Sequence, residues 1–276
     1  MRCIFCKQNS DGSKSIEHII PESLGNKINI LSQGVVCDKC NNYFAREVEK
    51  PFLEQSTIEL LRFEEGVENK KGKIPPTDGV IFPDIPVEVC KIFKDGISSE
   101  IRVSKESFNR IANLEKGLII LPKFSDELSL PGGSVLSRFI GKIAIEAFAQ
   151  RLQYNISLLE EFIDDAQIDS LRNHVRFGKK KVWNCNVRRI YKSTNYWKDG
   201  RNADIYQITN EYDFLFTDKS EVYFVLVLFG IEFVINIGGL CVDGYNEWLK
   251  EHGYISPLHY GKNEELHEVV NDSRPL

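Results

Sequence analysis

Two pairs of cysteines frame the N-terminal stretch of the sequence: residues 3–6 read CIFC and residues 37–40 read CDKC. In each pair the two intervening residues form a turn that can direct both thiolates toward one metal ion. Four thiolates satisfy the tetrahedral preference of zinc and leave no open position for a substrate. We therefore expect a structural zinc that stabilises a module with too little hydrophobic core of its own. Its predicted ligands are Cys3, Cys6, Cys37 and Cys40.

The segment between the two pairs carries an acid–histidine dipeptide. Residues 15–26 read SIEHIIPESLGN, and Asn41 and Asn42 follow the last cysteine directly. A histidine can accept a proton from water near neutral pH, because its reference pKa is about 6.5. Neighbouring residues on a strand point to opposite faces. Glu17 and His18 can therefore serve different partners, one a metal ion and the other the attacking water.

With these motifs in this order, residues 1–50 resemble the HNH endonuclease family, in the branch with an EHIIPxSLG core and a CxxCN ending. The resemblance implies a ββα-metal finger in which His18 is the general base and Glu17 and Asn41 hold a divalent ion. Oxygen ligands of this kind favour Mg²⁺ or Mn²⁺. The implied activity is metal-dependent hydrolysis of phosphodiester bonds in DNA that leaves 5′-phosphate and 3′-hydroxyl ends.

The chain departs from the family pattern at several positions. Many members have Asp at the position of Glu17 and His at that of Asn41, and some have a further His where this chain has Ala45. Binding of a transition metal by several imidazoles is therefore not expected. For the middle Asn of the motif, which braces the loop around the general base, we choose Asn29. Ser32 and Asn26 are the alternatives in the same stretch.

Each candidate residue also has a structural interpretation. His18 could be a buried histidine bonded to its own loop, and Glu17 an ordinary exposed carboxylate. Asn41 could cap the helix that begins near the second pair of cysteines. The combination of these residues with the two cysteine pairs favours the nuclease interpretation.

The composition is that of an ordinary globular protein, with 42% hydrophobic and 27% charged residues, and argues against general disorder. The net charge of -5 gives no sign of nucleic-acid binding by itself. A nuclease therefore needs a local basic patch.

Basic and aromatic residues are interleaved between Arg172 and Arg201, where Asp199 is the one acid. Cations neutralise phosphates and aromatic rings stack on unpaired bases, so this stretch is a candidate nucleic-acid face. The alternative is a solvated loop whose aromatic residues lie in the core; these are Trp183, Tyr191, Tyr196 and Trp197. The candidate nucleic-acid contacts are Lys179, Lys180, Lys181, Arg188 and Arg189, and, beyond Asn41, Arg46 and Lys50.

We divide the chain into a nuclease module with its exit helix (1–63), a linker or exposed loop (64–86) and a C-terminal domain (87–276). The middle stretch contains four prolines and the basic run 70–73, and it has few large apolar residues. The predicted fold class is α+β: the small zinc-stapled ββα-metal module is followed by an α+β domain with an antiparallel sheet.

Apolar spacing in the C-terminal domain predicts one helix from Gly133 onward and another over 157–175. The apolar run 222–242 approaches the length of a membrane span, but Gly230 and Glu232 interrupt it. We interpret this run as two buried strands, 221–229 and 232–237, joined by a tight turn at the glycine. Further strands are expected over 87–93, 100–104, 183–191, 205–209 and 214–216, with Asp95-Gly96 as the first turn.

The cysteine count favours a reducing compartment. Seven cysteines, with two CxxC pairs, do not fit a secreted disulfide framework, and the start of the chain is too polar for a signal peptide. We expect a cytoplasmic protein without a membrane segment. His259 lies in a polar tail, and we assign no role or partner to it.

Two rival functions remain at this level. The module could keep its zinc and bind nucleic acid without cutting it, or the protein could be an effector of bacterial antiviral defence that stays silent until a partner acts. A regulatory partner protein and a second copy of the chain both fit the second possibility. The residues do not distinguish DNA from RNA as the substrate. A requirement for Mg²⁺ or Mn²⁺ beyond the zinc separates the enzyme from the binding module.

Overall fold

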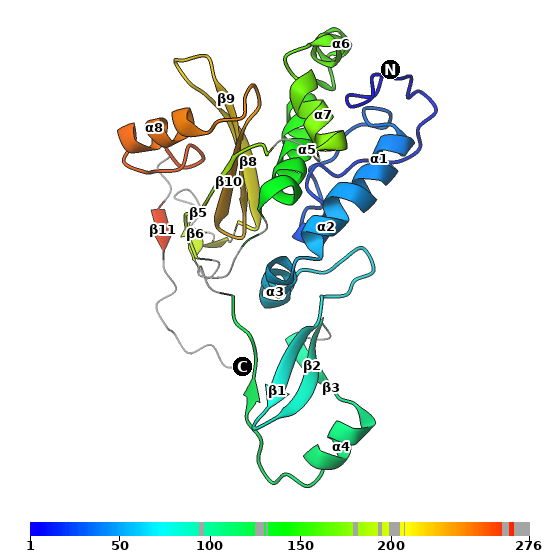
Figure 1. The fold of residues 1–276 in the computed structure, drawn as a ribbon, viewed down its shortest axis with the longest axis vertical. Helices are drawn as coiled ribbons and strands as arrows, with labels where there is room; N and C mark the ends of the chain where they lie inside the picture. The colour runs from blue at the N-terminus through cyan, green and yellow to red at the C-terminus, as the bar shows by residue number, and fades with distance from the viewer. Residues whose placement is uncertain are drawn as a thin grey trace. The chain divides into compact units, whose positions relative to one another are not determined.

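The fold is known from a computed structural model, which describes residues 1–93, 97–124, 130, 132–178, 182–192, 195–198, 205–206, 208–260 and 265–267. The chain forms two compact units (Figure 1). Unit 1 comprises Met1–Ile20, Asn26–Glu49 and Gly132–Leu276, and unit 2 comprises Pro21–Gly25 and Lys50–Pro131. The boundaries of these units differ from the predicted domain boundaries. Residues 1–20 and 26–49 of the predicted nuclease module belong to unit 1, and its residues 21–25 and 50–63 belong to unit 2.

The N-terminal part of unit 1 has a minimal ββα arrangement. His18 and Ile30 form an isolated antiparallel bridge. It is flanked by hydrogen bonds from the Ile19 amide to the Asn29 carbonyl (3.1 Å) and from the Leu31 amide to the Glu17 carbonyl (2.9 Å). Helix α1 (Asp38–Phe44) follows and continues into the π-helical turn η2 (Ala45–Glu49).

Three consecutive helices of unit 1 lie between residues 133 and 177. Helix α5 (Gly133–Leu152) contacts α6 (Ile156–Asp164) and α7 (Asp169–Phe177). The predicted helix from Gly133 is confirmed. The single helix predicted over 157–175 is two helices, because the backbone of Asp165 turns to an extended ψ of 113° at the end of α6.

The main sheet of unit 1 is antiparallel, with the strand order β5-β10-β9-β8. Its bounds are Cys185–Arg189 (β5), Asn210–Phe216 (β8), Val222–Leu228 (β9) and Ile231–Asn236 (β10). Phe229 and Gly230 both have positive φ, 51° and 79°. Such angles are those of a two-residue hairpin turn that matches the twist of the strands. The predicted hairpin is therefore confirmed, and among the described residues no helix is long and apolar enough to cross a membrane.

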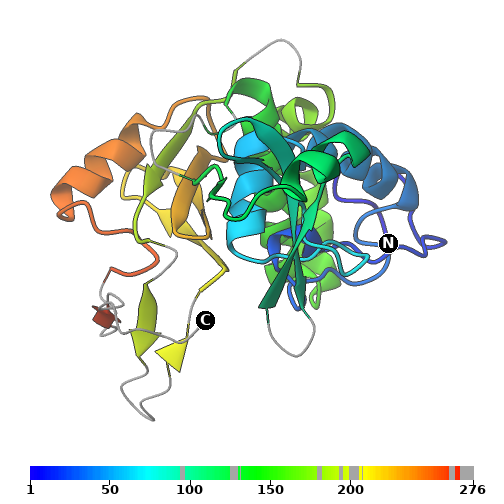
Figure 2. The same ribbon diagram turned by 90° about the horizontal axis from the view of Figure 1, so that it is seen from below.

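The hairpin strands are almost entirely apolar, apart from Glu232 and Asn236, because both faces of the sheet are covered. Tyr223, Val225 and Val227 pack in one core cluster with Tyr245 and Leu249, which belong to α8 (Asp243–Glu251). On the other face β10 contacts α5. Figures 1 and 2 show α8 and α5 on opposite sides of the sheet. A small separate sheet has the order β11-β6-β7, with bounds Glu265–His267, Tyr196–Lys198 and Ile205–Tyr206.

Unit 2 is built around a second antiparallel sheet, with the order β3-β2-β1-β4. Its buried core includes Phe63, Ile81 and Val87. The strands are Thr77–Ile81 (β1), Ile85–Phe93 (β2), Ile97–Arg102 (β3) and Ile119–Ile120 (β4). The helical segments are Glu22–Leu24 (η1), Lys50–Leu53 (α2), Ser56–Glu64 (α3) and Lys105–Ile111 (α4).

The sheet of unit 2 occupies part of the stretch expected to be a linker or loop. Strand β1 lies inside 64–86, and its burial alternates, with Thr77, Gly79 and Ile81 buried. The prolines that suggested a linker flank this strand rather than interrupt it. The Asp95-Gly96 turn lies outside the described residues. The fold class is α+β with antiparallel sheets, as predicted.

Candidate functional site

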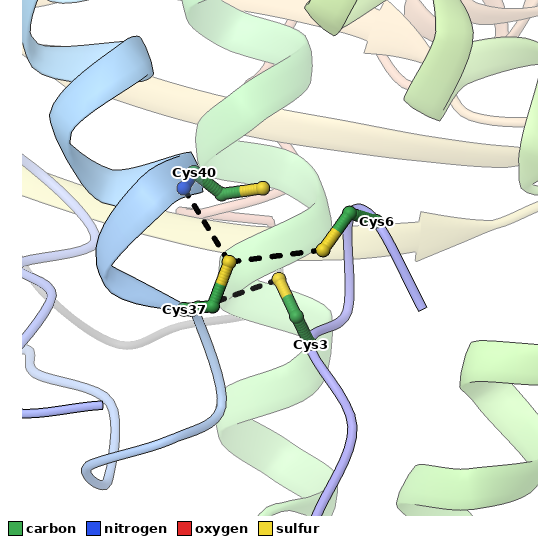
Figure 3. Close-up of side chains that lie close together, drawn as sticks. All are labelled: Cys3, Cys6, Cys37 and Cys40. Carbon is green, nitrogen blue, oxygen red and sulfur yellow. Dashed lines mark hydrogen bonds between the residues drawn. The ribbon is translucent and has the colours of Figure 1, made fainter. Parts of the chain in front are cut away.

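The four predicted zinc ligands come together at the base of the N-terminal finger. Their sulfur atoms all lie within 4.8 Å of one another, and Cys6 Sγ is 3.7 Å from Cys37 Sγ (Figure 3). Two ligands of a tetrahedron with Zn–S bonds of about 2.3 Å would be roughly 3.8 Å apart. The cluster therefore fits a four-thiolate zinc site.

Local backbone geometry holds these cysteines in place. Lys7 takes a left-handed φ of 59°, and its amide donates to the Cys3 carbonyl at 2.8 Å, which closes the first turn. Cys37 is the N-cap of α1, and its sulfur accepts from the Cys40 amide at 3.4 Å. A hydrogen bond from the Cys40 side chain, together with nearby backbone amides, lowers the pKa of Cys3 to about 5 against the effect of burial. The same hydrogen bond raises the pKa of the Cys40 thiol, so these contacts favour the thiolate form at Cys3.

Residues of α6 and α7 anchor the first cysteine turn. Arg172 is 2% exposed, and its Nε donates to the Ile4 carbonyl at 2.9 Å. Lys7 pairs with Asp169 at 2.7 Å, and Arg2 donates to Asp164 at 2.8 Å. The zinc cluster is therefore tied to helices that begin more than a hundred residues later in the chain.

His18 and Glu17 lie side by side on the first extended segment but in different surroundings. His18 is half-buried. Glu17 is 6% exposed, so it is not the surface carboxylate of the structural interpretation. Its Oε1 accepts a hydrogen bond of 2.6 Å from Lys142 Nζ of α5. The side chains of neighbouring residues on this segment thus meet different environments, as strand geometry requires.

Lys142 is at the centre of a buried ionic cluster. Its side chain is fully buried, and its Nζ lies 2.8 Å from Glu146 Oε2 and 2.8 Å from Glu49 Oε1, in addition to Glu17. Burial opposes the charge of Lys142, but the three carboxylates outweigh it and raise the pKa of its ammonium well above the usual value. Burial raises the pKa of Glu146 well above its ordinary range, despite the attraction of Lys142.

Lys142, Glu146 and Glu49 were not predicted from the sequence as residues of the site. A signal was available for the first two. They stand four residues apart inside the run Phe139–Ala149, which is otherwise apolar apart from a glycine, and the helix buries this run. Charged residues are almost never fully buried unless they are paired. Such a pair therefore predicts a buried ionic contact, although not with which partner.

The loop of the finger is braced by Asn26 rather than by the predicted Asn29. Asn26 is 2% exposed, and its Nδ2 donates to the Ile20 carbonyl (2.7 Å) and to the Asn29 carbonyl (2.9 Å). Its Oδ1 accepts from the Ile28 amide (3.1 Å) and the Asn29 amide (2.9 Å). In these bonds Asn29 takes part through its backbone. Asn26 was one of the alternatives that the sequence left open.

Asn41 lies within α1, and its side chain is half-buried. Cys37 is the N-cap of this helix, so Asn41 does not cap it. The backbone amide of Ser32, the third alternative for the brace, donates to Gln153 Oε1 of α5 at 2.7 Å.

The predicted nucleic-acid contacts divide into three groups. Lys179, Lys180 and Lys181 lie outside the described residues. Arg188 donates to the buried Glu232 at 2.5 Å, and Arg189 donates to the Tyr191 carbonyl at 3.2 Å. Both arginines therefore have partners inside the protein. Arg46 and Lys50 have mostly exposed side chains, with acidic neighbours Glu47 and Glu54.

Most of the interleaved aromatic residues belong to the core. Trp183, Tyr191 and Trp197 are 4%, 7% and 4% exposed. Trp197 stacks on His259, with ring centroids 4.6 Å apart, and His259 Nε2 lies 3.0 Å from Glu211 Oε1. His259 thus has structural partners that the sequence did not reveal. The rings of Tyr191 and Trp197 pack against each other, and Trp183 packs against His174, as the alternative interpretation of this stretch proposed.

A hollow of about 510 Å³ lies beside the zinc cluster. The turn after the first cysteine pair, the start of α1 and Arg176 of α7 line it. Lys39 supplies a second cation, and Gln8, Asn9 and Ser13 supply polar groups. This surface was not identified from the sequence, because its two cations lie far apart along the chain.

Comparison with protein families agrees with the geometry of the finger. Residues 3–57 match the family described as HNH endonuclease, which confirms the resemblance seen in the sequence. The match covers the four cysteines, the acid–histidine pair, α1 and η2. No curated protein and no solved structure matches the chain. Over these residues the finger is therefore similar to HNH endonucleases.

Proposed function

We propose that the protein is a metal-dependent HNH endonuclease that hydrolyses phosphodiester bonds in DNA. The observation that carries this proposal is the match of residues 3–57 to HNH endonucleases, in a segment whose four thiolates cluster as a zinc site. In this proposal His18 is the general base, and Glu17 and Asn41 hold Mg²⁺ or Mn²⁺.

The donor set suits such an ion. Carboxylate and amide oxygens are the ligands that hard divalent cations prefer. Three carboxylates surround the single ammonium of Lys142, so the region around Glu17 carries more negative than positive charge. When bound, the ion would supply charge stabilisation at the phosphate oxygens.

The protein's own residues would prepare the water and the substrate. His18 would accept a proton from the attacking water at a ring nitrogen, since a neutral imidazole is a good base near pH 7. Asn26 would keep the loop around His18 in one conformation through its four hydrogen bonds. Hydrolysis would leave 5′-phosphate and 3′-hydroxyl ends.

Several cations are proposed to contact the phosphate backbone. Lys39 and Arg176 line the hollow beside the zinc cluster, and both belong to unit 1. Because backbone contacts are electrostatic, they would bind without sequence preference. The sequence-derived candidates Arg46, Lys50, Lys179, Lys180 and Lys181 stay part of this proposal, whereas Arg188 is assigned to the buried pair with Glu232.

Plasmid cleavage tests the proposal. Wild-type protein should nick or linearise plasmid DNA only when Mg²⁺ or Mn²⁺ is added, and His18→Ala should reduce the rate about 10²–10⁴-fold. His252→Ala is the matched control, because His252 is also half-buried and its Nδ1 donates a hydrogen bond to the Trp248 carbonyl. Full cleavage by His18→Ala, with zinc still bound, would refute the role of this histidine.

The alternative is a zinc finger that binds nucleic acid without cutting it. The contact between Glu17 and Lys142 favours this alternative, because the carboxylate already has a cationic partner. Titration with Mn²⁺ decides between the two: the binding module takes up zinc alone, whereas the enzyme binds a second ion. RNA and single-stranded DNA, tested as substrates beside the plasmid, establish the substrate class.

We further propose a cytoplasmic location and a role in antiviral defence. Four clustered thiols that bind zinc suit a reducing compartment. The defence role rests on analogy with other proteins that carry this module. If wild-type protein cuts plasmid freely without any partner, a partner-activated effector is ruled out.

A further inference from the structure

The ionic cluster around Lys142 joins the nuclease finger to a helix outside the matched segment. Glu17 comes from the first extended segment, and Glu49 ends η2. Lys142 and Glu146 are one turn apart on α5. Residues 3–57 alone therefore contain two of the carboxylates but not the cation that both of them contact.

A role in stability alone is a weak explanation for this cluster. Apolar residues of similar volume often replace a buried ion pair without loss of stability, because desolvation offsets much of the attraction. Here Lys142 and Glu146 are completely buried, and even with Glu146 protonated, as its raised pKa favours, the carboxylates of Glu17 and Glu49 outnumber the single ammonium. Stability would favour a balanced pair or none. The excess of carboxylates indicates that a further positive charge is needed beside Glu17.

The π-helical turn brings Glu49 toward the helix face that carries Asn41. Asn41 and Glu49 are eight residues apart, and an unbroken α-helix with 3.6 residues per turn would rotate them apart by about 80°. A π turn takes more residues, so it removes part of this rotation. The turn η2 spans Ala45–Glu49, between the two positions. Insertions of this kind are frequent at functional sites.

We propose that Lys142 is a positioning residue of the nuclease site. Its ammonium holds the Glu17 carboxylate in the orientation needed for the divalent ion and keeps Glu49 beside it, while Glu146 fixes the ammonium from the same helix. Helix α5 is thus part of the nuclease site rather than of a separate specificity domain. This inference rests on the proposed function, because it assigns Glu17 to the divalent ion.

The physical basis is the repulsion between carboxylates. Glu17 and Glu49 contact one ammonium at 2.6 and 2.8 Å, so without it two carboxylates of like charge would face each other at low exposure. The two carboxylates would then move apart or rotate. The side chain of Glu17 would no longer be held in the orientation needed to bind the divalent ion. Lys142 contacts neither substrate nor reacting atoms in this scheme, so it acts through Glu17.

The experiment measures ion binding and cleavage separately on the full chain. Zinc-loaded wild type and Lys142→Met are titrated with Mn²⁺, and bound ion is followed by electron paramagnetic resonance. The Mg²⁺ concentration that gives half-maximal plasmid cleavage is measured in parallel. Removal of a residue that orients a metal ligand typically weakens metal binding or activity by about 10–100-fold. We expect that loss in Mn²⁺ affinity, with cleavage partly restored at high Mg²⁺.

A matched control separates positioning from stability. Glu232→Gln removes the charge of another completely buried glutamate, which is paired with Arg188 in the main sheet. This variant should lower the melting temperature but leave the Mn²⁺ affinity at the wild-type value. Lys142→Met is compared at equal zinc content and below its own melting temperature. If Lys142→Met does not fold, Lys142→Gln takes its place, because its amide removes the positive charge and can still donate a hydrogen bond within the cluster.

The outcomes distinguish this inference from the proposed function. If wild type cuts DNA, His18→Ala does not, and a folded Lys142→Met binds Mn²⁺ as wild type does, the positioning role is refuted and the nuclease stands. The same conclusion follows if only a folded Lys142→Gln is available and its Mn²⁺ affinity is that of wild type. If wild type binds no ion beyond zinc, both proposals fall. A weaker affinity in Lys142→Met alone, with the control unchanged, supports the positioning role.

Discussion

Two buried ionic clusters in the described part of unit 1 differ in their charges. In the main sheet the carboxylate of Glu232 accepts from Arg188 at 2.5 Å and from the hydroxyl of Tyr245 at 2.5 Å. One cation thus meets one carboxylate. Around Lys142 one ammonium meets three carboxylates. The first cluster is balanced in charge, although Arg188 Nη2 and Glu232 Oε2 are buried without a hydrogen-bond partner among the described residues. The second has acidic groups in excess, and it is the one next to the proposed nuclease residues.

The two clusters also differ in how the fold brings their charged residues together. The residues of the balanced cluster lie opposite each other on neighbouring strands, since Glu232 pairs in register with Arg188. The sheet alone therefore brings them together. The members of the other cluster come from an extended segment, a π-helical turn and α5, so only the packing of distant segments assembles them. A charge imbalance maintained by such packing is better explained by a ligand than by stability.

The largest expected effect is the loss of the structural zinc. Structural zinc contributes about 10–16 kcal/mol of binding free energy in zinc-finger peptides, and that energy is also folding energy. Cys37→Ser should therefore lose zinc and all cleavage, because the first extended segment and α1 would no longer be held together. The main sheet with Glu232 should stay folded. Zinc content, circular dichroism and plasmid cleavage measure these effects.

The control for this change is Cys241→Ser, since Cys241 is exposed and lies outside the zinc cluster. It should retain both zinc and cleavage. Cleavage at the wild-type rate by zinc-free Cys37→Ser would show that the Lys142 cluster does not depend on the zinc.

An intermediate effect is expected when the balanced cluster is broken. Glu232→Ala leaves the guanidinium of Arg188 without its partner in a mostly buried position, and the loss of one member of such a pair costs about 3–5 kcal/mol. Urea denaturation should show this decrease in the free energy of unfolding. The Mg²⁺ dependence of cleavage should not change below the melting temperature. If the Mg²⁺ dependence of cleavage does change in Glu232→Ala, the two clusters are coupled, and ion binding can no longer be assigned to only one of them.

The smallest expected effect concerns the cations at the surface. Lys39→Ala and Arg176→Ala should each weaken DNA binding equally for all sequences and reduce the slope of log affinity against log salt by about 1. Lys250→Ala, at an exposed position of α8, serves as the control with the slope of wild type. Fluorescence anisotropy at several salt concentrations measures the slopes. If all variants have the slope of wild type, Lys39 and Arg176 do not contact DNA, and the hollow beside the zinc cluster is not part of the interface.

Local patterns predicted much of the fold. The spacing of CIFC and CDKC identified the zinc ligands, because two residues between cysteines fix a turn by themselves. The glycine at 230 identified a hairpin turn, since its φ of 79° is one that few other residues adopt. The helix from Gly133 followed from its apolar spacing. In each case the determining residues are neighbours in the chain.

Other features could not be predicted from spacing. Asn26 and Asn29 are the same residue type three positions apart, and only the course of the loop decides which side chain turns inward. The break at Asp165 leaves the apolar pattern of 157–175 intact, so that pattern did not reveal it. Trp183 and Trp197 are equally compatible with a stacking surface and with a core, and tertiary packing buries both.

The sequence by itself determined the chemistry available to the finger: four thiolates at zinc spacing, an adjacent acid and histidine, and a family match over residues 3–57. The tertiary structure alone decided that Glu17 meets Lys142, which lies 125 residues later. A sequence motif predicts contacts between residues that are close in sequence, because chain connectivity keeps such residues close in space in any fold. Contacts between distant residues depend on how every intervening element packs, and no short pattern contains that information.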